Sequence, residues 1–261
     1  MLSTHAWWLA PAALAAFVLY TLYTLPHWAT RLAAAAFPSV LFFQEEGVRQ
    51  QPKLVALTID DGPSCEVTPP LLRLLRRHGA HATMFVIGSE GEGGAGRQLL
   101  QAAVAEGHEL GNHTWTDRPS IRVPLDELRH EIAAVEDLIE GAYEACGVQR
   151  PAKRWFRPGC GWFSSGMVQA ARAMGMRTAL GDVFPHDPWV SIASLNAAIV
   201  LWRVRPGSVI VLHDARPWLI PTLDTVLPEL RRRGYKVVTL SELVAGSTQQ
   251  QESDERQPLL H

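Results

Sequence analysis

The spacing of hydrophobic and polar positions changes along the chain and divides it into two regions. Residues 6–25 are apolar or nearly so and carry no charge. From Lys53 onward, short apolar runs alternate with longer stretches in which apolar residues recur at helical spacing. Short runs are typical of buried strands, and helical spacing is typical of amphipathic helices. The sequence therefore predicts an apolar N-terminal segment followed by alternating strands and helices.

The alternating region predicts an α/β fold. Its strand candidates are 54–59, 82–87, 108–111, 154–157, 177–181, 208–213 and 235–240. Its helix candidates are 68–78, 96–106, 124–145, 164–175, 192–204 and 219–233. Strands that alternate with helices of this length predict a mostly parallel sheet, either open or closed into a barrel.

The uncharged run at 6–25 predicts a transmembrane helix, because about 20 apolar residues are enough to cross a bilayer. Tryptophan and tyrosine residues near both ends fit the aromatic belts of membrane–water interfaces. A cleaved signal peptide is the alternative, because small residues at 32–36 offer a cleavage site. The run is long for a signal peptide and no basic segment precedes it, so we expect an uncleaved anchor.

These patterns predict four segments. They are a membrane anchor or signal segment at 1–30, a linker at 31–52, a folded domain at 53–245 and a polar, disordered tail at 246–261. The 261 residues suit one domain of α/β-barrel size, and a hydrophobic content of 47% is ample for its core.

Charge and cysteine content narrow the classes of function. The net charge is −2 and no basic stripe with interleaved aromatic residues occurs, so we expect no nucleic-acid partner. Cys65, Cys146 and Cys160 are scattered, and they form neither a disulfide framework nor a Cys-x-x-Cys metal clip.

Chemically reactive side chains follow the predicted strands at their C-terminal ends. In chain order they are Asp60 and Asp61, His113 and Asp117, Arg157, Asp187, and His213 with Asp214. In barrels and open α/β sheets alike, active sites are built at that edge. Two aspartates before Gly62-Pro63 could also serve only as turn residues. Five consecutive sets at one edge favour a functional site instead.

The residue types indicate metal-assisted hydrolysis. Asp61, His113 and Asp117 can supply three ligands to a divalent cation and leave a position for water. Such an ion lowers the pKa of bound water and polarises a carbonyl group. Asp60 can then accept the proton of the water, and His213 can donate one to a leaving group. Five of the other histidines are expected to be structural: His78, His81, His108, His130 and His186.

Five segments resemble the ordered motifs of polysaccharide deacetylases, the NodB-homology domain of carbohydrate esterase family 4. They are TIDDGP (58–63), HTWTD (113–117), FRPGCG (156–161), the segment around Asp187, and VLHD (211–214). The resemblance covers about residues 53–245 and implies a distorted (β/α) barrel of fewer than eight strands. It also implies metal-dependent removal of acetyl groups from N-acetylglucosamine polymers such as chitin or peptidoglycan.

The resemblance also implies a role for each matching residue. Asp60 would be the general base, held by Arg157, and His213 the general acid, oriented by Asp187. Asp61 and His113 would bind the metal ion. A backbone N–H near Cys160 would stabilise the oxyanion together with the metal ion.

Three departures from the family pattern affect this prediction, and one is that the segment DVFPHDPW (182–189) around Asp187 matches the family's fourth motif only loosely. Asp117 stands where the family usually has its second metal-binding histidine, which makes the metal site less positive. We expect zinc, with manganese or cobalt as alternatives. Gly159-Cys160 replaces the usual Pro-Tyr, so an aromatic wall of the sugar groove is missing while a backbone donor remains.

The sequence leaves three functions open. The first is a membrane-anchored deacetylase of N-acetylated glycans; the others are an O-acetyl esterase or small-amide hydrolase, and a non-catalytic glycan-binding protein. A glycan substrate places the domain on the luminal or extracellular side, or outside the cell if the N-terminal segment is cleaved. The basic residues after the apolar run would alone place it in the cytosol, although large domains can translocate regardless of flanking charge.

Overall fold

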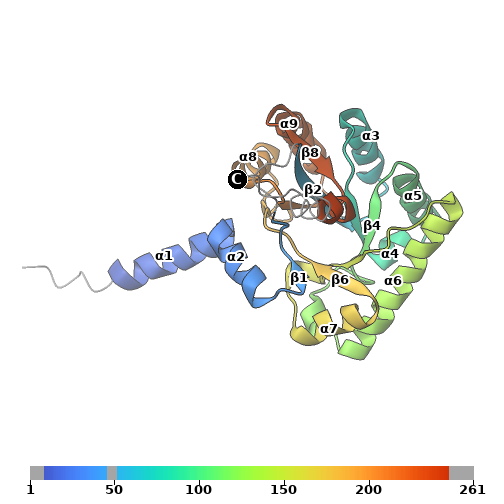
Figure 1. The fold of residues 1–261 in the computed structure, drawn as a ribbon, viewed down its shortest axis with the longest axis horizontal. Helices are drawn as coiled ribbons and strands as arrows, with labels where there is room; N and C mark the ends of the chain where they lie inside the picture. Colours follow the sequence, from blue (N-terminus) through green and yellow to red (C-terminus); the bar gives the residue numbers. More distant parts are fainter. Residues whose placement is uncertain (1–8, 46–51, 247–261) are drawn as a thin grey trace, which may run out of the picture.

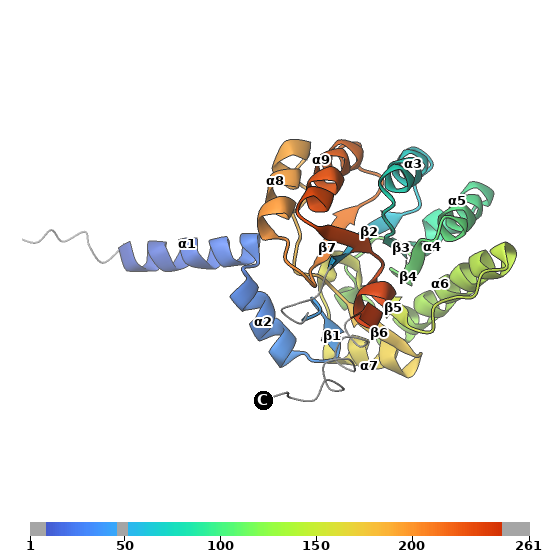
Figure 2. The same ribbon diagram turned by 45° about the horizontal axis from the view of Figure 1, so that its top comes forward.

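A curled parallel sheet forms the centre of the protein, and helices surround it (Figures 1 and 2). The computed structural model describes residues 9–45 and 52–246. The strands within these ranges are β1 (Val40–Leu41), β2 (Lys53–Gly62), β3 (Thr83–Val86), β4 (Glu109–Asn112), β5 (Arg154–Phe156), β6 (Met176–Ala179), β7 (Val209–His213) and β8 (Tyr235–Val238). The helices are α1 (Leu9–Thr24), α2 (His27–Ala36), α3 (Thr68–His78), α4 (Gly88–Gly91), α5 (Gly94–Ala105), α6 (Leu125–Cys146), α7 (Ser165–Ala173), α8 (Ala193–Arg203) and α9 (Leu219–Arg232).

The strands form one curled sheet, a half-barrel. Neighbouring strands run β1-β6-β5-β4-β3-β2-β7, all in parallel, and β8 pairs with the first half of β2. Isolated bridges from Val183 to Ile210 and from Phe43 to Ser208 join the segments after β6 and β1 to the β7 side. Parallel pairing brings the C-terminal ends of the strands to one edge, where the predicted site residues follow them.

The predicted elements agree with this architecture. All seven strand candidates and all six helix candidates correspond to elements of the structure. The sequence predicted fewer than eight strands for the domain at 53–245, and seven of the eight strands described lie within these residues.

The predicted linker at 31–52 needs correction, because it supplies the remaining strand. Val40 and Leu41 form β1, which pairs with β6, and Phe42 is buried beside them. Burying such a short apolar run stabilises the edge of the sheet. Residues 40–43 of the predicted linker are therefore part of the folded sheet.

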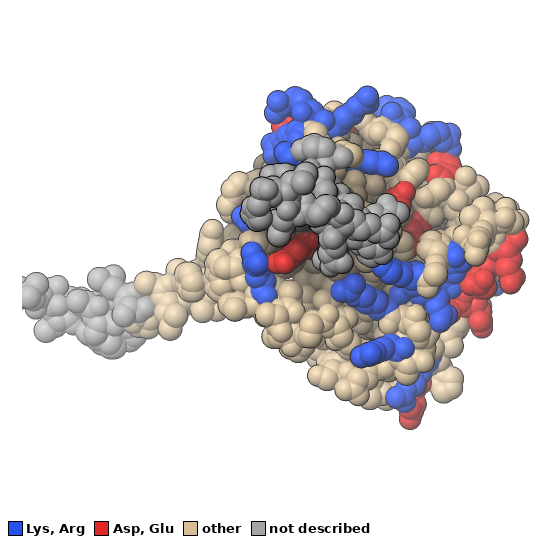
Figure 3. Space-filling view, viewed as in Figure 1, with Lys and Arg blue, Asp and Glu red and all other residues tan. Residues whose placement is uncertain are grey.

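The N-terminal segment forms α1 and α2, and α1 extends away from the barrel (Figure 1). In the space-filling view α1 shows no charged side chain, whereas the barrel surface shows both signs (Figure 3). α1 has 16 residues, and no helix in residues 9–45 or 52–246 is long and apolar enough to cross a membrane. The predicted transmembrane anchor is thus not confirmed. The disordered tail predicted at 246–261 lies, apart from its first residue, outside the described residues.

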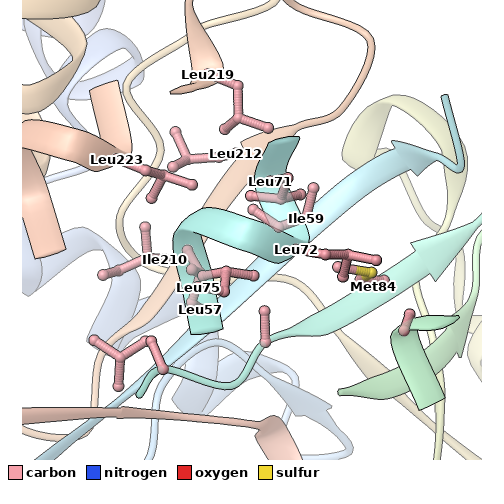
Figure 4. Close-up of a cluster of buried hydrophobic side chains, with 14 of the residues drawn as sticks. Leu57, Ile59, Leu71, Leu72, Leu75, Met84, Ile210, Leu212, Leu219 and Leu223 are labelled. Atoms are coloured by element: carbon pink, nitrogen blue, oxygen red, sulfur yellow. The ribbon is translucent and has the colours of Figure 1, made fainter. Parts of the chain in front are cut away.

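The alternation of β2 decides which side chains point into the barrel. Leu57 and Ile59 pack with Leu71 and Leu75 of α3 and with Leu223 of α9 in the largest buried cluster (Figure 4). Successive side chains of a strand point to opposite faces. Thr58 and Asp60 alternate with Leu57 and Ile59, so they face away from the helices. On that opposite face of the sheet they contact Arg157.

Candidate active site

Arg157 and Asp60 form a buried ion pair at the centre of the site. Arg157 Nη1 lies 2.6 Å from Asp60 Oδ1 and 2.7 Å from Thr58 Oγ1. Its remaining donors contact the carbonyl oxygens of Ala179, at 3.0 Å, and Leu180. Because every side of the guanidinium is occupied, it is held rigidly and fixes the orientation of the Asp60 carboxylate.

A second pair lies on the neighbouring strand. His213, at the end of β7, is the register partner of Asp60 on β2. Asp187 accepts a hydrogen bond from the His213 backbone N–H and contacts His213 Nδ1, both at 2.9 Å. Burial alone would lower the pKa of His213, but the hydrogen bond and charge of Asp187 raise it above its ordinary value. The structure thus brings Asp187 to His213, as the predicted orienting role requires.

A kink at the end of β2 turns the adjacent carboxylates to a common neighbour. In a regular strand, Asp60 and Asp61 would point to opposite faces. Here the register with β3 is irregular between Ile59 and Gly62, and Asp61 has a left-handed φ of 66°. His113 Nε2 consequently lies 3.5 Å from Asp61 Oδ1 and 3.9 Å from Asp60 Oδ2.

His113 is oriented to offer Nε2 to these carboxylates. It follows β4, and its Nδ1 lies 2.8 Å from the backbone oxygen of Arg157. Burial alone would lower the pKa of His113, but Asp60 and Asp61 raise it overall. Burial alone would raise the pKa of Asp61, but the His113 hydrogen bond and nearby positive charges lower it. The raised pKa of His113 and the lowered pKa of Asp61 favour a protonated His113 beside an ionised Asp61. A cation bound at this place would compete with that proton.

The predicted group of three metal ligands is not assembled in these side-chain positions. Among residues 9–45 and 52–246, no three His, Cys, Asp or Glu side chains lie so that they could hold one ion. Asp117 is exposed in an irregular loop rather than a helical turn, so its four-residue spacing from His113 does not stack the side chains. Loss of hydration and the Asp61 charge raise the pKa of Asp117.

Two of the three predicted ligands, Asp61 and His113, nevertheless lie where both could bind one divalent cation. Asp61 and His113 present an oxygen and a ring nitrogen to each other, and the second nitrogen of His113 bonds to a backbone carbonyl, as in metal-binding histidines. Asp117 stays a prediction as the third ligand.

Cys160 lies in a tight turn beside this cluster. It has a left-handed φ of 60°, and its thiol is within range of the charges of Asp61 and Asp117, which raise its pKa after burial. The neighbouring N–H groups are already used, Gly159 toward Ser120 Oγ and Gly161 toward the Pro158 carbonyl. The oxyanion role of the Cys160 N–H stays a prediction.

Three contributors were missed at the sequence level. Thr58 bonds to Arg157, Trp218 Nε1 donates to the Asp187 carbonyl at 2.9 Å, and Arg216 Nη2 lies 3.5 Å from Asp61 Oδ2. Strand alternation offered a signal for Thr58, which precedes Asp60 by two positions and shares its face. Trp218 and Arg216 follow His213 in an irregular turn, where no periodic pattern indicates side-chain direction.

Comparison with known proteins agrees with this geometry. The family described as polysaccharide deacetylase matches residues 47–179. The chain is also 32% identical over 199 residues to a peptidoglycan-N-acetylglucosamine deacetylase of Bacillus cereus, covering 74% of this chain and 88% of that one. The chain belongs to the polysaccharide deacetylase family. It is accordingly a hydrolase of the class that acts on N-acetyl amide bonds.

Other relatives differ in length and substrate. The chain is 30% identical over 203 residues to a chitooligosaccharide deacetylase of Bradyrhizobium, covering 72% of this chain and 90% of that one. It is 30% identical over 191 residues to PgdA, a peptidoglycan-N-acetylglucosamine deacetylase of Listeria monocytogenes, covering 73% of this chain but only 39% of PgdA.

Solved polysaccharide deacetylase structures share the fold. Peptidoglycan deacetylase PdaC from Bacillus subtilis superposes with a TM-score of 0.70 at 29% identity, covering 79% of this chain and 98% of that one. A family 4 acetyl xylan esterase from Clostridium thermocellum with a cobalt ion superposes with a TM-score of 0.66 at 32% identity, covering 74% of this chain and 91% of that one. A pseudoenzyme of carbohydrate esterase family 4 from Bacillus anthracis superposes with a TM-score of 0.69 at 26% identity, covering 79% of this chain and 69% of that one.

Proposed function

We propose that this polysaccharide deacetylase removes N-acetyl groups from N-acetylglucosamine-containing glycans, chitin-like oligosaccharides or peptidoglycan, in a metal-dependent reaction. The observation that carries the proposal is the pairing of two supported acid–base groups on adjacent strands. Arg157 holds Asp60 on β2, and Asp187 holds its register partner His213 on β7. A protein that only bound glycans would have no need of this arrangement.

The residues can divide the reaction between them. Asp60 takes a proton from water while the oxygen of that water bonds to the amide carbonyl carbon. His213 then donates a proton to the amide nitrogen as the C–N bond breaks. The products are acetate and a free amine. Asp187 keeps Nδ1 of His213 engaged, so that Nε2 is the nitrogen left to donate.

Asp61 and His113 would hold the divalent cation, with Asp117 as the candidate third ligand. When bound, such an ion supplies an acidified water and polarises the carbonyl oxygen. Zinc is the expected ion, and manganese or cobalt could replace it; the similar acetyl xylan esterase carries cobalt. The backbone N–H of Cys160 would complete the stabilisation of the oxyanion.

An aromatic cluster beside His213 supports a sugar substrate. The Phe184 ring lies 5.6 Å from His213 and 6.0 Å from Trp189, and His186 lies against both Phe184 and Trp189. The Trp189 side chain is 76% exposed. An exposed indole fixed at the edge of a catalytic group offers a stacking surface for the apolar face of a pyranose ring.

Acetate release from chitooligosaccharides by residues 9–261 tests the proposal, with chelated protein reconstituted with Zn²⁺, Mn²⁺ or Co²⁺. The matched control is Asp60→Asn, which retains an oxygen for Arg157 but cannot accept the proton. Metal-dependent release that this variant lacks supports the deacetylase. Folded protein that releases no acetate with any metal ion overturns it.

Two observations favour specific alternatives. The similar acetyl xylan esterase points to O-acetyl esters, so acetylated xylan belongs in the same assay. The similar pseudoenzyme and the incomplete three-ligand group favour a non-catalytic glycan-binding protein. Glycan binding without acetate release and without stoichiometric metal uptake would support that second alternative.

The proposed substrate carries a localisation with it. We place the domain on the luminal or extracellular side of a membrane, or outside the cell if the N-terminal segment is cleaved. Protease treatment of intact vesicles tests this placement, because a domain in the lumen is protected until detergent is added.

A further inference from the structure

A turn after β7 directs a second arginine toward the proposed metal ligands. Ala215 has a left-handed φ of 55°, a conformation that costs a residue with a Cβ about 1–2 kcal/mol. The Leu219 N–H donates to the Arg216 carbonyl at 2.9 Å and closes the turn. The Arg216 side chain thereby reaches Asp61 at the end of β2, 155 positions earlier in the chain.

Arg216 and Arg157 differ in how much of each guanidinium is used. Arg157 is 3% exposed in its side chain, and contacts with protein oxygens occupy its donors. Arg216 is 28% exposed and has one acceptor among the described residues, Asp61 Oδ2 at 3.5 Å. A guanidinium has five N–H donors, so most of those of Arg216 remain available to a ligand.

Asp61 Oδ2 lies 3.5 Å from Arg216, whose side chain is 28% exposed, and Asp61 Oδ1 lies 3.5 Å from His113, whose side chain is 4% exposed. Arg216 therefore lies on the solvent side of the reacting centre rather than within it. A second cation, Arg122, is exposed, and it is close enough for its charge to act on the Cys160 thiol. Two arginines therefore lie near the site, together with the exposed carboxylate of Asp117.

We propose that Arg216 forms an anion-binding subsite that selects glycans bearing a carboxylate close to the acetamido group. Planar carboxylates match the guanidinium fork, which can donate two parallel hydrogen bonds. The lactyl ether of an N-acetylmuramic acid ring and the ring carboxylate of a uronic acid neighbour both offer this chemistry. This inference rests on the proposed deacetylase function, and it names the substrate class of that same site.

Binding tests the inference separately from turnover. Zinc-loaded Asp60→Asn protein is titrated calorimetrically with an N-acetylglucosamine–N-acetylmuramic acid tetrasaccharide and with its lactyl methyl ester, which differs only in charge. We expect the acid to bind about tenfold more tightly than the ester at low salt, as a charge-assisted pair at a partly exposed site would give. The preference should shrink in high salt. A glucuronate-containing tetrasaccharide, compared with its own methyl ester, shows which carboxylate source is preferred.

Variants in the same background assign the preference to Arg216. Arg216→Gln should bind acid and ester equally, whereas Arg216→Lys should retain part of the preference. Arg97→Gln, an exposed arginine on α5, is the matched control and should leave it unchanged. Equal binding of every acid and its ester by the Asp60→Asn protein overturns the inference, as does a preference that survives Arg216→Gln. If wild-type protein releases no acetate, the proposed function is overturned. The binding comparison still decides whether Arg216 forms the subsite.

Discussion

The two ends of the barrel each bury a carboxylate, and they use it in opposite ways. At the N-terminal ends of the strands, Glu109 accepts hydrogen bonds from Thr83, Trp155 and Ser241, with Thr83 Oγ1 at 2.7 Å and Trp155 Nε1 at 3.0 Å. At the C-terminal ends, Asp61 has longer contacts among the described residues, to His113 and to Arg216, each at 3.5 Å. A fully hydrogen-bonded carboxylate stabilises the fold, whereas one with loose partners can still bind a cation or ligand.

Backbone geometry produces this difference. Thr83 and Glu109 begin β3 and β4 and are in register, so regular pairing places donor and acceptor together. Asp61 follows an irregular register and has left-handed backbone torsions. Such strain at a strand end is typical of functional sites. Four changes test whether stability and chemistry are separated between the two ends.

The largest expected effect is on chemistry at the C-terminal end. Asp60→Asn should lower acetate release about 10²–10⁴-fold, because the general base is lost. The melting temperature should also fall, because the buried Arg157 guanidinium loses its counter-charge although the amide oxygen can still accept its hydrogen bond. Steady-state kinetics and thermal unfolding on one preparation measure both. More than a tenth of wild-type activity in this variant would remove Asp60 from the base role.

At the N-terminal end the effect should fall on stability. Glu109→Ala removes the acceptor of the Thr83 hydroxyl and of the Ser241 N–H and hydroxyl, while Trp155 Nε1 keeps Ser241 Oγ as a second acceptor. We expect unfolding to be easier by about 3–5 kcal/mol. Activity per folded molecule should be unchanged. Chemical denaturation gives the first quantity, and active-site titration gives the second. Glu109→Gln keeps an acceptor and should cost less; an equal cost would mean that the charge matters more than the hydrogen bonds.

The third change sharpens the role of Asp187. Because Asp187 raises the pKa of His213, Asp187→Asn should lower that pKa and shift the alkaline limb of kcat/KM toward lower pH. General-acid catalysis is lost once His213 is deprotonated, so activity at neutral pH should fall about tenfold. A pH–rate profile checks the shift. An activity loss with an unmoved alkaline limb would instead indicate misplacement of His213.

The smallest effect is a pH-dependent one at the N-terminal end. Burial lowers the pKa of His108 to about 4, and its Nδ1 accepts the Ala82 N–H at 3.2 Å. The unfolded state therefore binds the proton more tightly, and stability is lost as pH falls from about 6.5 toward 4. At pH 5.5 this loss amounts to about 1.4 kcal/mol. His108→Asn should remove that part of the slope.

Asp182 supplies the necessary comparison. Burial raises its pKa to about 6, so the folded state holds this proton more tightly and stability falls as pH rises from about 4 to 6. The two groups oppose each other in wild-type protein. Only the difference between wild-type and His108→Asn denaturation curves, measured from pH 4 to 7, isolates His108; parallel curves would contradict its lowered pKa.

The sequence by itself determined the elements and the edge at which the site lies. Periodicity identified the strands from β2 to β8 and the main helices, because burying one face of a strand or helix imposes spacing on the apolar residues. It also placed Asp60, His113, Arg157 and His213 after strands, and parallel strands bring such positions to one edge. The apolar residues at 40–43 carried a strand too, but two residues are too few to show a period.

Only the tertiary structure decided how those side chains meet. The contacts of Arg157 with Thr58 and Asp60 and the approach of Arg216 to Asp61 join residues about 100 or more positions apart in the chain, and the kink at Asp61 turns it toward His113 of another strand. The loop after His113 likewise decided that Asp117 does not stack beside it. Local spacing encodes which face a residue occupies within its own element. Distances between side chains of different elements depend on register, backbone kinks and packing, which arise only when the barrel closes.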